Sequence, residues 1–278
     1  MKVLVTGANG YIGRHVVEKL LEKENVEVIA NDVNVEGVDK RAISNKTNLF
    51  TSQDPYNEFE QPEVCIHLAW MDGFVHNADS HILYLSNHYS FIKKMLDGGL
   101  KHLVVMGTMH EVGYYEGAID ENTPCNPLSK YGIAKNTLRQ SLELLVKNYE
   151  GVVFQWLRGF YIVGDSERGN SIFSKITRAE KNGEKTFPFT TGKNKYDFVD
   201  LDLFAKQIVE SSLQSDVVGV INCCSGEPVS LAERVEKFIK DNEYSIKLNY
   251  GAFPDRAYDS PAIWGDNSKI NRIIRNSK

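Results

Sequence analysis

The sequence has few cysteines, no long apolar run and no excess of positive charge. Its four cysteines show no metal-ligand spacing, and we expect them to be reduced, which predicts a cytoplasmic protein. His76, His81 and His88 lack the spacing and the acidic companions of a metal site, so we expect packing or surface roles and no metal. A membrane helix requires roughly 20 apolar residues in a row, and their absence predicts no membrane contact. The formal net charge of −5, without a basic run, argues against a nucleic-acid-binding protein.

The N-terminal segment joins a strand pattern, a glycine-rich turn and a helix pattern. Residues 2–6 are mostly apolar, residues 7–13 (GANGYIG) follow at once, and a helical pattern begins at Arg14. In such a turn the three glycines permit a tight bend, a close approach of a dinucleotide diphosphate, and close packing of the helix on the strand. Three glycines alone also occur in plain turns, so the flanking strand and helix patterns carry the argument. The predicted cofactor-binding residues here are Gly7, Asn9, Gly10, Tyr11, Ile12 and Gly13.

An acidic residue follows the second strand pattern. Residues 26–30 are largely apolar and end in Asn31-Asp32, about twenty residues past the glycines. A carboxylate at this place can accept hydrogen bonds from the adenosine ribose and repels a 2′-phosphate, so Asp32 favours NAD over NADP. Arg14 is a contrary signal, because a guanidinium near the turn could bind that phosphate, and NADP stays possible.

A second chemical pattern lies mid-chain, in Tyr131-Gly132-Ile133-Ala134-Lys135. On a helix, Tyr131 and Lys135 share one face, although such a pair is also common on helix surfaces. An ammonium group near a phenol stabilises the phenolate and lowers the phenol pKa, and the phenol can then exchange a proton with an alcohol oxygen. Thr108 follows the strand pattern of residues 103–106, at the end where open α/β sheets bind ligands. Thr108, Tyr131 and Lys135 are therefore our candidate catalytic residues.

Strand-like runs alternate with helical patterns along most of the chain. The strand-like runs cover residues 3–5, 26–30, 64–68, 103–106, 152–157 and 220–223, and helical patterns include residues 82–96, 131–148 and 201–213. This alternation predicts an α/β protein with a Rossmann-type, doubly wound parallel sheet. We expect residues 1–164 to form a dinucleotide-binding domain, to which residues 196–224 return. Residues 165–195 and 225–278 would form a smaller C-terminal substrate-binding cap.

Taken together, these motifs resemble those of the extended short-chain dehydrogenases/reductases, in the NAD-dependent epimerase/dehydratase family that modifies nucleotide-linked sugars. The matching segments occur in family order and cover nearly the whole chain. They are TGANGYIG (6–13), CIHLAW (65–70), VMGTMHEVG (105–113), PLSKYGIAK (127–135), LRGFYIVG (157–164), YDFVDLD (196–202), NCCSGEPVS (222–230) and RAYDSPAIWGDNSKI (256–270).

The resemblance implies roles for the candidate catalytic residues. Tyr131 would be the acid/base, Lys135 its partner, and Thr108 would take the place of the usual catalytic Ser or Thr. Tyr131 and Lys135 would also contact the cofactor. The further residues that the resemblance places beside the nicotinamide are Leu68, Ala69 and Trp70.

The resemblance also indicates where substrate binds and where this chain departs from its relatives. Arg256 and Asp259 match an Arg-x-x-Asp that contacts the nucleotide end of the substrate, and His110 is a candidate for the sugar. Tyr161 stands where many relatives have an Asn that touches the sugar-nucleotide. Tyr196 stands where many have a diphosphate-binding Arg, for which a nearby Lys could substitute. In many relatives an Asp-Ile or Asp-Leu pair after the third strand contacts adenine. No such pair is evident around residues 48–54.

Several functions share this machinery. The resemblance favours a 4-ketoreductase, in which NAD(P)H reduces a nucleotide-linked 4-keto-6-deoxyhexose at C4 and Tyr131 protonates the oxygen. A 4-epimerase with retained NAD is the alternative. A 4,6-dehydratase is less favoured, because Met109-His110 stand where an Asp-Glu pair would follow Thr108. A non-catalytic, cofactor-sensing regulator is disfavoured by the intact catalytic set.

Family members also suggest a homodimer, in which the helices over residues 82–96 and 131–148 pair with their copies. An apolar stripe on the second of these helices suits such an interface, but core packing accounts for it equally well. The stripe consists of Leu138, Leu142, Leu145 and Val146.

Overall fold

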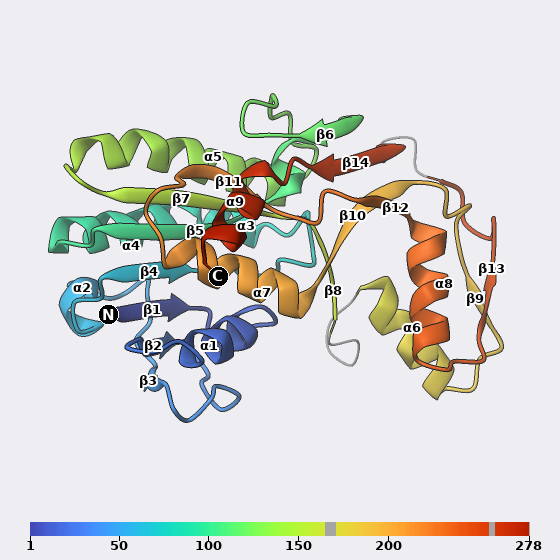
Figure 1. The fold of residues 1–278 in the computed structure, drawn as a ribbon, viewed down its shortest axis with the longest axis horizontal. Helices are drawn as coiled ribbons and strands as arrows, with labels where there is room; N and C mark the ends of the chain where they lie inside the picture. The colour runs from blue at the N-terminus through green and yellow to red at the C-terminus, as the bar shows by residue number, and fades with distance from the viewer. Residues whose placement is uncertain (165–170, 256–258, 278) are drawn as a thin grey trace.

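The computed structural model describes residues 1–164, 171–255 and 259–277, and a seven-stranded sheet forms the centre of its larger part (Figure 1). The strands are β1 (Lys2–Thr6), β2 (Glu27–Asn31), β3 (Ile43–Asn45), β4 (Val64–His67), β5 (His102–Thr108), β7 (Val153–Gly159) and β11 (Gly219–Cys223). Their order is β11-β7-β5-β4-β1-β2-β3, and every pairing is parallel. The predicted Rossmann-type, doubly wound parallel sheet is therefore confirmed.

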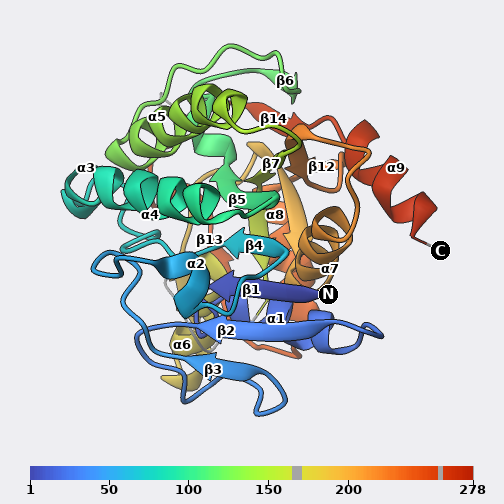
Figure 2. The same cartoon turned by 90° about the vertical axis from the view of Figure 1, so that its left-hand side faces the viewer.

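Helices cover both faces of this sheet (Figure 2). One face carries α1 (Gly13–Leu21), α7 (Leu201–Ser212) and α9 (Ser268–Asn276), and the other carries α2 (Pro55–Glu58), α3 (Ser80–Leu83), α4 (Leu85–Gly98) and α5 (Lys130–Leu145). Side chains of β1 alternate between the faces, so Val3 and Val5 enter the core beneath α1 and α7, whereas Leu4 enters the core beneath α4 and α5. The single helix that we predicted over residues 82–96 is two helices, which meet at Tyr84.

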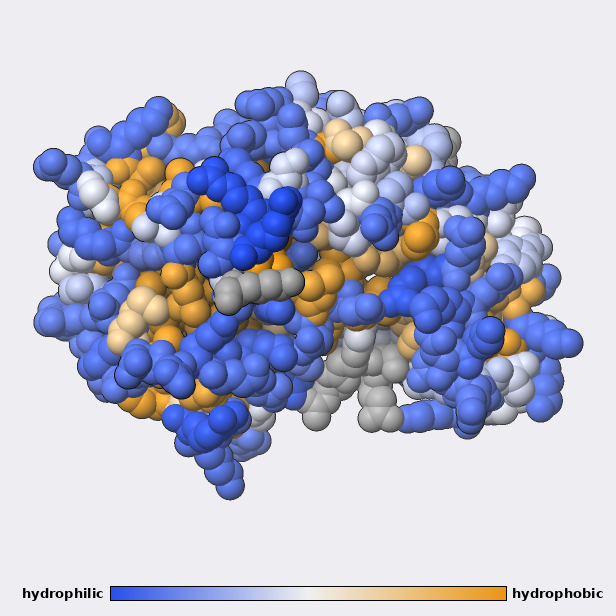
Figure 3. All heavy atoms as spheres, in the orientation of Figure 1, coloured by the Kyte–Doolittle hydropathy of each residue, from blue (hydrophilic) through white to orange (hydrophobic). Residues whose placement is uncertain are grey.

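A smaller part lies beyond the carboxyl ends of the central strands (Figure 1). Its five-stranded sheet runs β12 (Pro228–Ser230), β10 (Lys195–Asp200), β14 (Ala262–Gly265), β6 (Gly117–Ile119), with β8 (Tyr161–Val163) also paired to β10. A two-stranded sheet of β9 (Thr186–Pro188) and β13 (Lys247–Asn249) completes it, with α6 (Ile172–Lys181) and α8 (Leu231–Asp241). Phe173, Ile176 and Val235 belong to a separate apolar core between these helices. The face drawn in Figure 3 is mostly polar, with apolar side chains in patches on the larger part and near the seam between the two parts.

The chain passes between the two parts more than once. Strand β10 belongs to the second sheet, whereas α7 and β11, which follow it, lie in the larger part. After β14 the chain returns, and α9 packs against α7 and β11. The division into a dinucleotide-binding domain and a cap remains a prediction. Within the described ranges, no helix has both the length and the apolar character of a membrane span.

Candidate active site

The glycine turn after β1 is as tight as its sequence predicts. Gly7 has φ of +70°, and a Cβ there would lie 2.7 Å from the backbone nitrogen of Ala69. The Gly10 N–H donates to the Gly7 carbonyl (3.0 Å). A Cβ on Gly13 would lie 2.1 Å from that same carbonyl oxygen, and α1 begins at Gly13. The glycine turn, the start of α1 and the end of β4 therefore lie close together and form a cradle that any side chain at these glycines would fill. This cradle fits a dinucleotide diphosphate.

Asp32 lies at the end of β2, next to the glycine turn. Its Oδ2 accepts the Asn9 backbone N–H (3.0 Å), so the carboxylate faces the turn. Arg14 lies on the same side, because a Cβ on Gly37 would meet both the Asn9 side chain (2.4 Å) and Arg14 Nη1 (3.4 Å). The predicted ribose-binding acid and the contrary guanidinium therefore lie at the same end of the cradle.

The segment after β4 connects this cradle to the candidate catalytic residues. Leu68 N–H donates to the Thr6 carbonyl (3.1 Å), and Ala69 N–H is 3.4 Å from Thr6 Oγ1. The Trp70 ring then lies beneath Lys135, whose Nζ is 3.8 Å from the ring centroid. The three residues predicted to border the nicotinamide thus run from the glycine turn to the predicted acid/base partner.

Thr108, Tyr131 and Lys135 come together at the carboxyl end of β5. Thr108 is the last residue of β5, and the side chain of Ser129 caps α5 by accepting the Gly132 N–H (3.1 Å). The Thr108 side chain lies beside the Tyr131 phenol and acts to lower its pKa. Lys135 is 2% exposed, and its Nζ donates to the Met106 carbonyl (2.7 Å). The sequence spacing therefore places all three groups in one site.

The electrostatics of this site differ from the expectation that Lys135 lowers the pKa of Tyr131. Burial raises the pKa of Tyr131 above its usual value, the charge of Glu111 adds to this, and the Thr108 side chain opposes it. Burial also lowers the pKa of Lys135 to about 7, against the opposing effect of Glu111. The ammonium contacts the Met106 carbonyl and the Trp70 ring rather than the phenol oxygen, which is why the expected stabilisation of the phenolate is absent from this arrangement.

Aromatic rings enclose Tyr131. His76 stacks on it with centroids 5.4 Å apart, His81 lies at 5.2 Å, and Trp70 and His110 lie at 6.2 Å. His76 and His110 also contact each other at 4.4 Å. The Tyr131 N–H donates to the His76 carbonyl (2.9 Å), which ties the loop before α3 to the start of α5. These contacts fix the position of the Tyr131 ring.

His67 and His88 pack against this cluster of rings, and for His88 this is one of the roles that the sequence predicted. His88 stacks on Trp70 at 4.4 Å and shares a hydrogen bond with His67 (2.9 Å). Trp70 Nε1 donates to His81 Nδ1 (3.0 Å). No group of three metal-ligating side chains occurs within the described residues.

These buried imidazoles predict a loss of stability in mild acid. Burial lowers the pKa of His67 well below its ordinary 6.5 and that of His88 to about 3. The unfolded chain therefore binds more protons below pH 6.5, and the free energy of unfolding should fall as pH falls. Between pH 6.5 and 5 we expect a loss of about 2–4 kcal/mol, measured by urea unfolding. His88→Leu should reduce this slope, and a flat profile in wild type would contradict the assignment.

The candidate substrate residues lie near the second sheet, apart from Arg256, which lies outside the described residues. Asp259 precedes Ser260, whose Oγ accepts the Tyr115 N–H (3.2 Å). This places Asp259 beside the loop that follows β5. Tyr161 contacts His110 at 6.2 Å.

The two tyrosines that replace the expected Asn and Arg contact each other. The rings of Tyr161 and Tyr196 lie 4.6 Å apart, and Phe198 lies 5.8 Å from Tyr161. Both strands that carry them, β8 and β10, pair in parallel. The departures are therefore coupled, because an aromatic pair occupies the place of two polar groups.

Glu111 is the residue of this site that sequence reasoning missed. It is fully buried in the 3-10 helix η1 (Met109–Glu111), and its Oε1 accepts the Thr108 N–H (2.7 Å). Thr108 and Glu111 form a capping box. The Thr-x-x-Glu pattern after a strand was the available signal.

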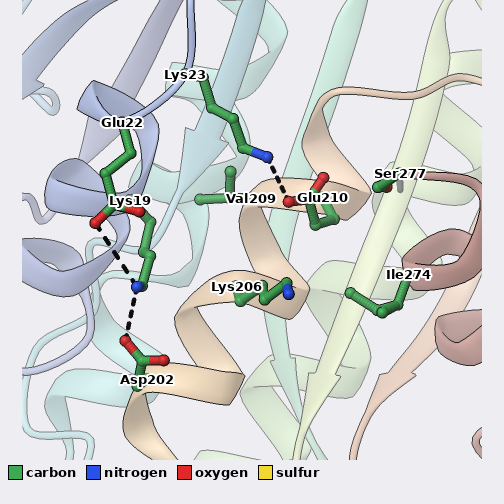
Figure 4. A pocket seen from close by; sticks show the side chains of 9 residues that line it. All are labelled: Lys19, Glu22, Lys23, Asp202, Lys206, Val209, Glu210, Ile274 and Ser277. Carbon is green, nitrogen blue, oxygen red and sulfur yellow. Dashed lines mark hydrogen bonds and ion pairs between the residues drawn. The ribbon is translucent and has the colours of Figure 1, made fainter.

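A separate hollow of about 360 Å³ lies between α1, α7 and α9, in the helix layer opposite α5 (Figure 4). Its charges compensate one another, with Lys19 paired to Asp202 (2.8 Å) and Lys23 to Glu210 (2.5 Å). It contains none of the predicted site residues. The lining residues are Lys19, Glu22, Lys23, Asp202, Lys206, Val209, Glu210, Ile274 and Ser277.

Comparison with known proteins agrees with this geometry. The NAD dependent epimerase/dehydratase family matches residues 3–224. The chain belongs to this family. The predicted resemblance and the prediction of an NAD-dependent enzyme are thereby confirmed.

Individual relatives include dehydrogenases and epimerases. The dTDP-6-deoxy-L-talose 4-dehydrogenase (NAD(+)) of Aggregatibacter actinomycetemcomitans is 43% identical over 272 residues, covering 95% of this chain and 99% of the relative. The GDP-6-deoxy-D-talose 4-dehydrogenase of the same organism is 23% identical, covering 99% of this chain and 92% of the relative. A UDP-glucuronic acid 4-epimerase from Bacillus cereus, solved with UDP-glucuronic acid and NAD, matches with a TM-score of 0.82 at 22% identity, covering 99% of this chain and 93% of that chain. This last likeness shows the fold alone.

Proposed function

We propose that the protein is an NAD-dependent oxidoreductase that interconverts the C4 ketone and C4 alcohol of a nucleotide-linked 6-deoxyhexose. The observation that carries this proposal is the assembly of Thr108, Tyr131 and Lys135 at one sheet edge beside the glycine cradle. The 43% identity to a 4-dehydrogenase of a dTDP-linked 6-deoxy sugar, over nearly the full length of both chains, supports the substrate class.

The chemistry that bound NAD would supply is hydride exchange at C4. Tyr131 donates a proton to the C4 oxygen in the reducing direction and removes it in the reverse direction. Thr108, whose side chain lies beside the Tyr131 phenol, orients that oxygen. The raised pKa of Tyr131 keeps the phenol protonated at neutral pH, which suits it as the acid of ketone reduction. The surrounding rings of His76 and Trp70 exclude water from the proton transfer.

The proposed binding residues follow from the same geometry. Asp259 and Arg256 would contact the nucleotide end of the substrate, and His110 and Tyr161 the sugar. Residues 165–195 and 225–278 would form the cap over it, with residues 1–164 and 196–224 as the cofactor domain. The proposed cofactor contacts are Gly7, Asn9, Gly10, Tyr11, Ile12, Gly13, Asp32, Leu68, Ala69, Trp70, Tyr131 and Lys135.

A 4-epimerase is the second candidate, since several solved structures of this fold are 4-epimerases. A 4,6-dehydratase has less support. Met109 and His110 follow Thr108, and the nearest carboxylate, Glu111, is held in the core by Thr108 N–H and Trp156 Nε1 (2.7 and 3.0 Å). A carboxylate bound in this way cannot reach a substrate proton.

Nicotinamide absorbance distinguishes the two main candidates. Purified protein would be mixed with NADH or NADPH and a panel of dTDP-, GDP- and UDP-linked 4-keto-6-deoxyhexoses. Net oxidation of NADH with one of these sugars would support the 4-ketoreductase and identify its substrate. No net oxidation, together with NAD released from the denatured protein, would overturn it in favour of an epimerase that reuses its own cofactor.

We also propose a homodimer through the α4 and α5 layer. Leu138, Leu142 and Leu145 are buried in the core of the subunit, so they do not supply the interface. Instead α5 presents Ile133 and Leu144, which are 44% and 66% exposed. Leu144 also borders a shallow hollow that Tyr89 and Ser141 line.

Leu144→Glu should therefore shift the protein from dimer to monomer, because it places a charge at the centre of the proposed interface. Sedimentation equilibrium measures the shift. Leu203→Glu is the matched control, since Leu203 is 40% exposed on α7 in the opposite layer. A wild-type monomer, or an L144E dimer of unchanged affinity, would contradict the proposed interface.

A further inference from the structure

Glu111 joins the candidate catalytic threonine to the interior of the protein. Its Oε1 accepts the Thr108 N–H (2.7 Å), and Trp156 Nε1 donates to both carboxylate oxygens (3.0 Å each). Glu111 has no exposed surface. The carboxylate is therefore held from two sides by N–H donors of β5 and β7.

Two guanidinium groups complete the surroundings of this carboxylate. Arg158 Nε lies 3.6 Å and Arg139 Nε 3.8 Å from Glu111 Oε2, and their side chains are 1% and 13% exposed. Beyond them, the Cys125 sulfur lies 3.9 Å from a nitrogen of each guanidinium. Burial raises the pKa of Glu111, and the guanidiniums and N–H donors oppose it. The Thr108 N–H and Trp156 Nε1–H both donate to the carboxylate, whereas the Nε–H of each guanidinium makes no hydrogen bond, so the two arginines act on Glu111 through their charge.

The packing around Glu111 leaves the catalytic loop little freedom. A Cβ on Gly107 would lie 2.0 Å from Trp156 Nε1 and 2.7 Å from Glu111 Oε1. The backbone immediately before Thr108 therefore lies directly against the Glu111–Trp156 pair. A shift of the Glu111 side chain would shift Thr108 with it.

Thr108 passes this constraint to Tyr131. Its hydroxyl accepts the His110 N–H (3.3 Å) and lies beside the Tyr131 phenol. The charge of Glu111 also acts on Tyr131. Lys135 lies on α5, the helix that carries Tyr131, and the rings of His76, His81 and His110 contact the Tyr131 ring. Among these groups, Glu111 supplies the negative charge that raises the pKa of the Tyr131 phenol.

We infer that Glu111 is a positioning residue of the proposed oxidoreductase, which fixes Thr108 for the reacting oxygen and whose negative charge acts on the phenol of Tyr131. This inference rests on the proposed function. In this role Glu111 itself contacts neither substrate nor cofactor. Its effect reaches the reaction through Thr108 and through its field at Tyr131.

The test uses Glu111→Gln in the full-length protein. Glutamine keeps an acceptor for the Thr108 N–H but removes the charge and turns an NH₂ group toward the guanidiniums. We expect kcat for ketone reduction to fall about tenfold or more while KM changes less than about threefold. The alkaline limb of the pH–rate profile should move down by about one pH unit, because the phenolate then forms more readily.

Two further variants separate positioning from general loss of structure. Glu143→Gln is the control, because Glu143 pairs with the same Arg139 (2.6 Å) at 39% exposure and should leave kcat and the pH profile unchanged. Glu111→Asp keeps the charge on a shorter side chain. It should lower kcat yet retain the wild-type alkaline limb. The inference would be overturned if the alkaline limb of the E111Q pH–rate profile stayed at the wild-type pH. It would also be overturned if the alkaline limb of E111D moved as far as that of E111Q.

Failure of the proposed function is distinguishable from failure of this inference. Ultraviolet titration of the phenol needs no substrate, and subtraction of the Tyr131→Phe spectrum isolates Tyr131. If wild type reduces no sugar of the panel but E111Q still ionises Tyr131 at lower pH than wild type, the proposed function fails and the electrostatic role of Glu111 stands. If the two titrations coincide, the role of Glu111 fails whatever the substrate.

Discussion

Replacement of Tyr131 by phenylalanine should lower kcat of sugar reduction by about 10²–10⁴-fold, the range expected when a general acid is removed. The ring of residue 131 packs against His76, His81 and Trp70, and phenylalanine retains these contacts. Only the hydroxyl, which lies beside Thr108, is lost. NAD binding should therefore change by less than about threefold, since the glycine cradle is untouched.

Steady-state kinetics and a fluorescence titration with NAD would measure the two effects separately. Tyr114→Phe is the matched control, because Tyr114 is 47% exposed and its hydroxyl bonds only the nearby Glu116 among the contacts described. It should leave both quantities unchanged. Turnover of Y131F within about tenfold of wild type would remove Tyr131 from the role of acid/base.

Gly13→Ala should weaken NAD binding by about 100-fold or more. The added Cβ would lie 2.1 Å from the Gly7 carbonyl oxygen and 2.9 Å from Ala8 Cα, and both are backbone atoms that cannot rotate away. Helix α1 must therefore move off β1, which opens the cradle. Overpacking strain that destabilises the NAD-bound protein by about 3 kcal/mol lowers the affinity for NAD by about 100-fold.

Isothermal titration with NAD measures this loss, and thermal unfolding reports whether the protein remains folded. Gly73→Ala is the control, because a Cβ at Gly73 meets no atom within 4 Å. Its affinity and Tm should match wild type. If G13A bound NAD as tightly as G73A does, the cradle would not be the diphosphate site.

Local patterns were enough to predict much of the fold. The glycine turn depends on three residues whose roles are decided within a dozen positions, and Tyr131 and Lys135 are neighbours on one helix. The parallel sheet followed from alternating strand and helix patterns. Such features depend on steric and periodic rules that act over one or two turns of chain.

Other features arise only when distant segments meet. Glu111 acquires its partners from β5, β7 and α5, and Trp156 and Arg158 of β7 lie 45 and 47 residues after it along the chain. The ring cluster around Tyr131 draws His76 from the loop before α3 and His110 from η1. Neither set has a spacing that a single sequence reveals.

By itself, the sequence predicted the family, the parallel sheet and the cofactor class, and it proposed Thr108, Tyr131 and Lys135 as candidate catalytic residues, because each rests on local motifs or periodic patterns. The tertiary structure decided the proton affinities at the site, which depend on burial and on charges from separate strands. It also decided that Leu138 and Leu142 belong to the core while Leu144 faces outward. Burial and electrostatic fields are properties of the packed chain, so no local pattern could supply them.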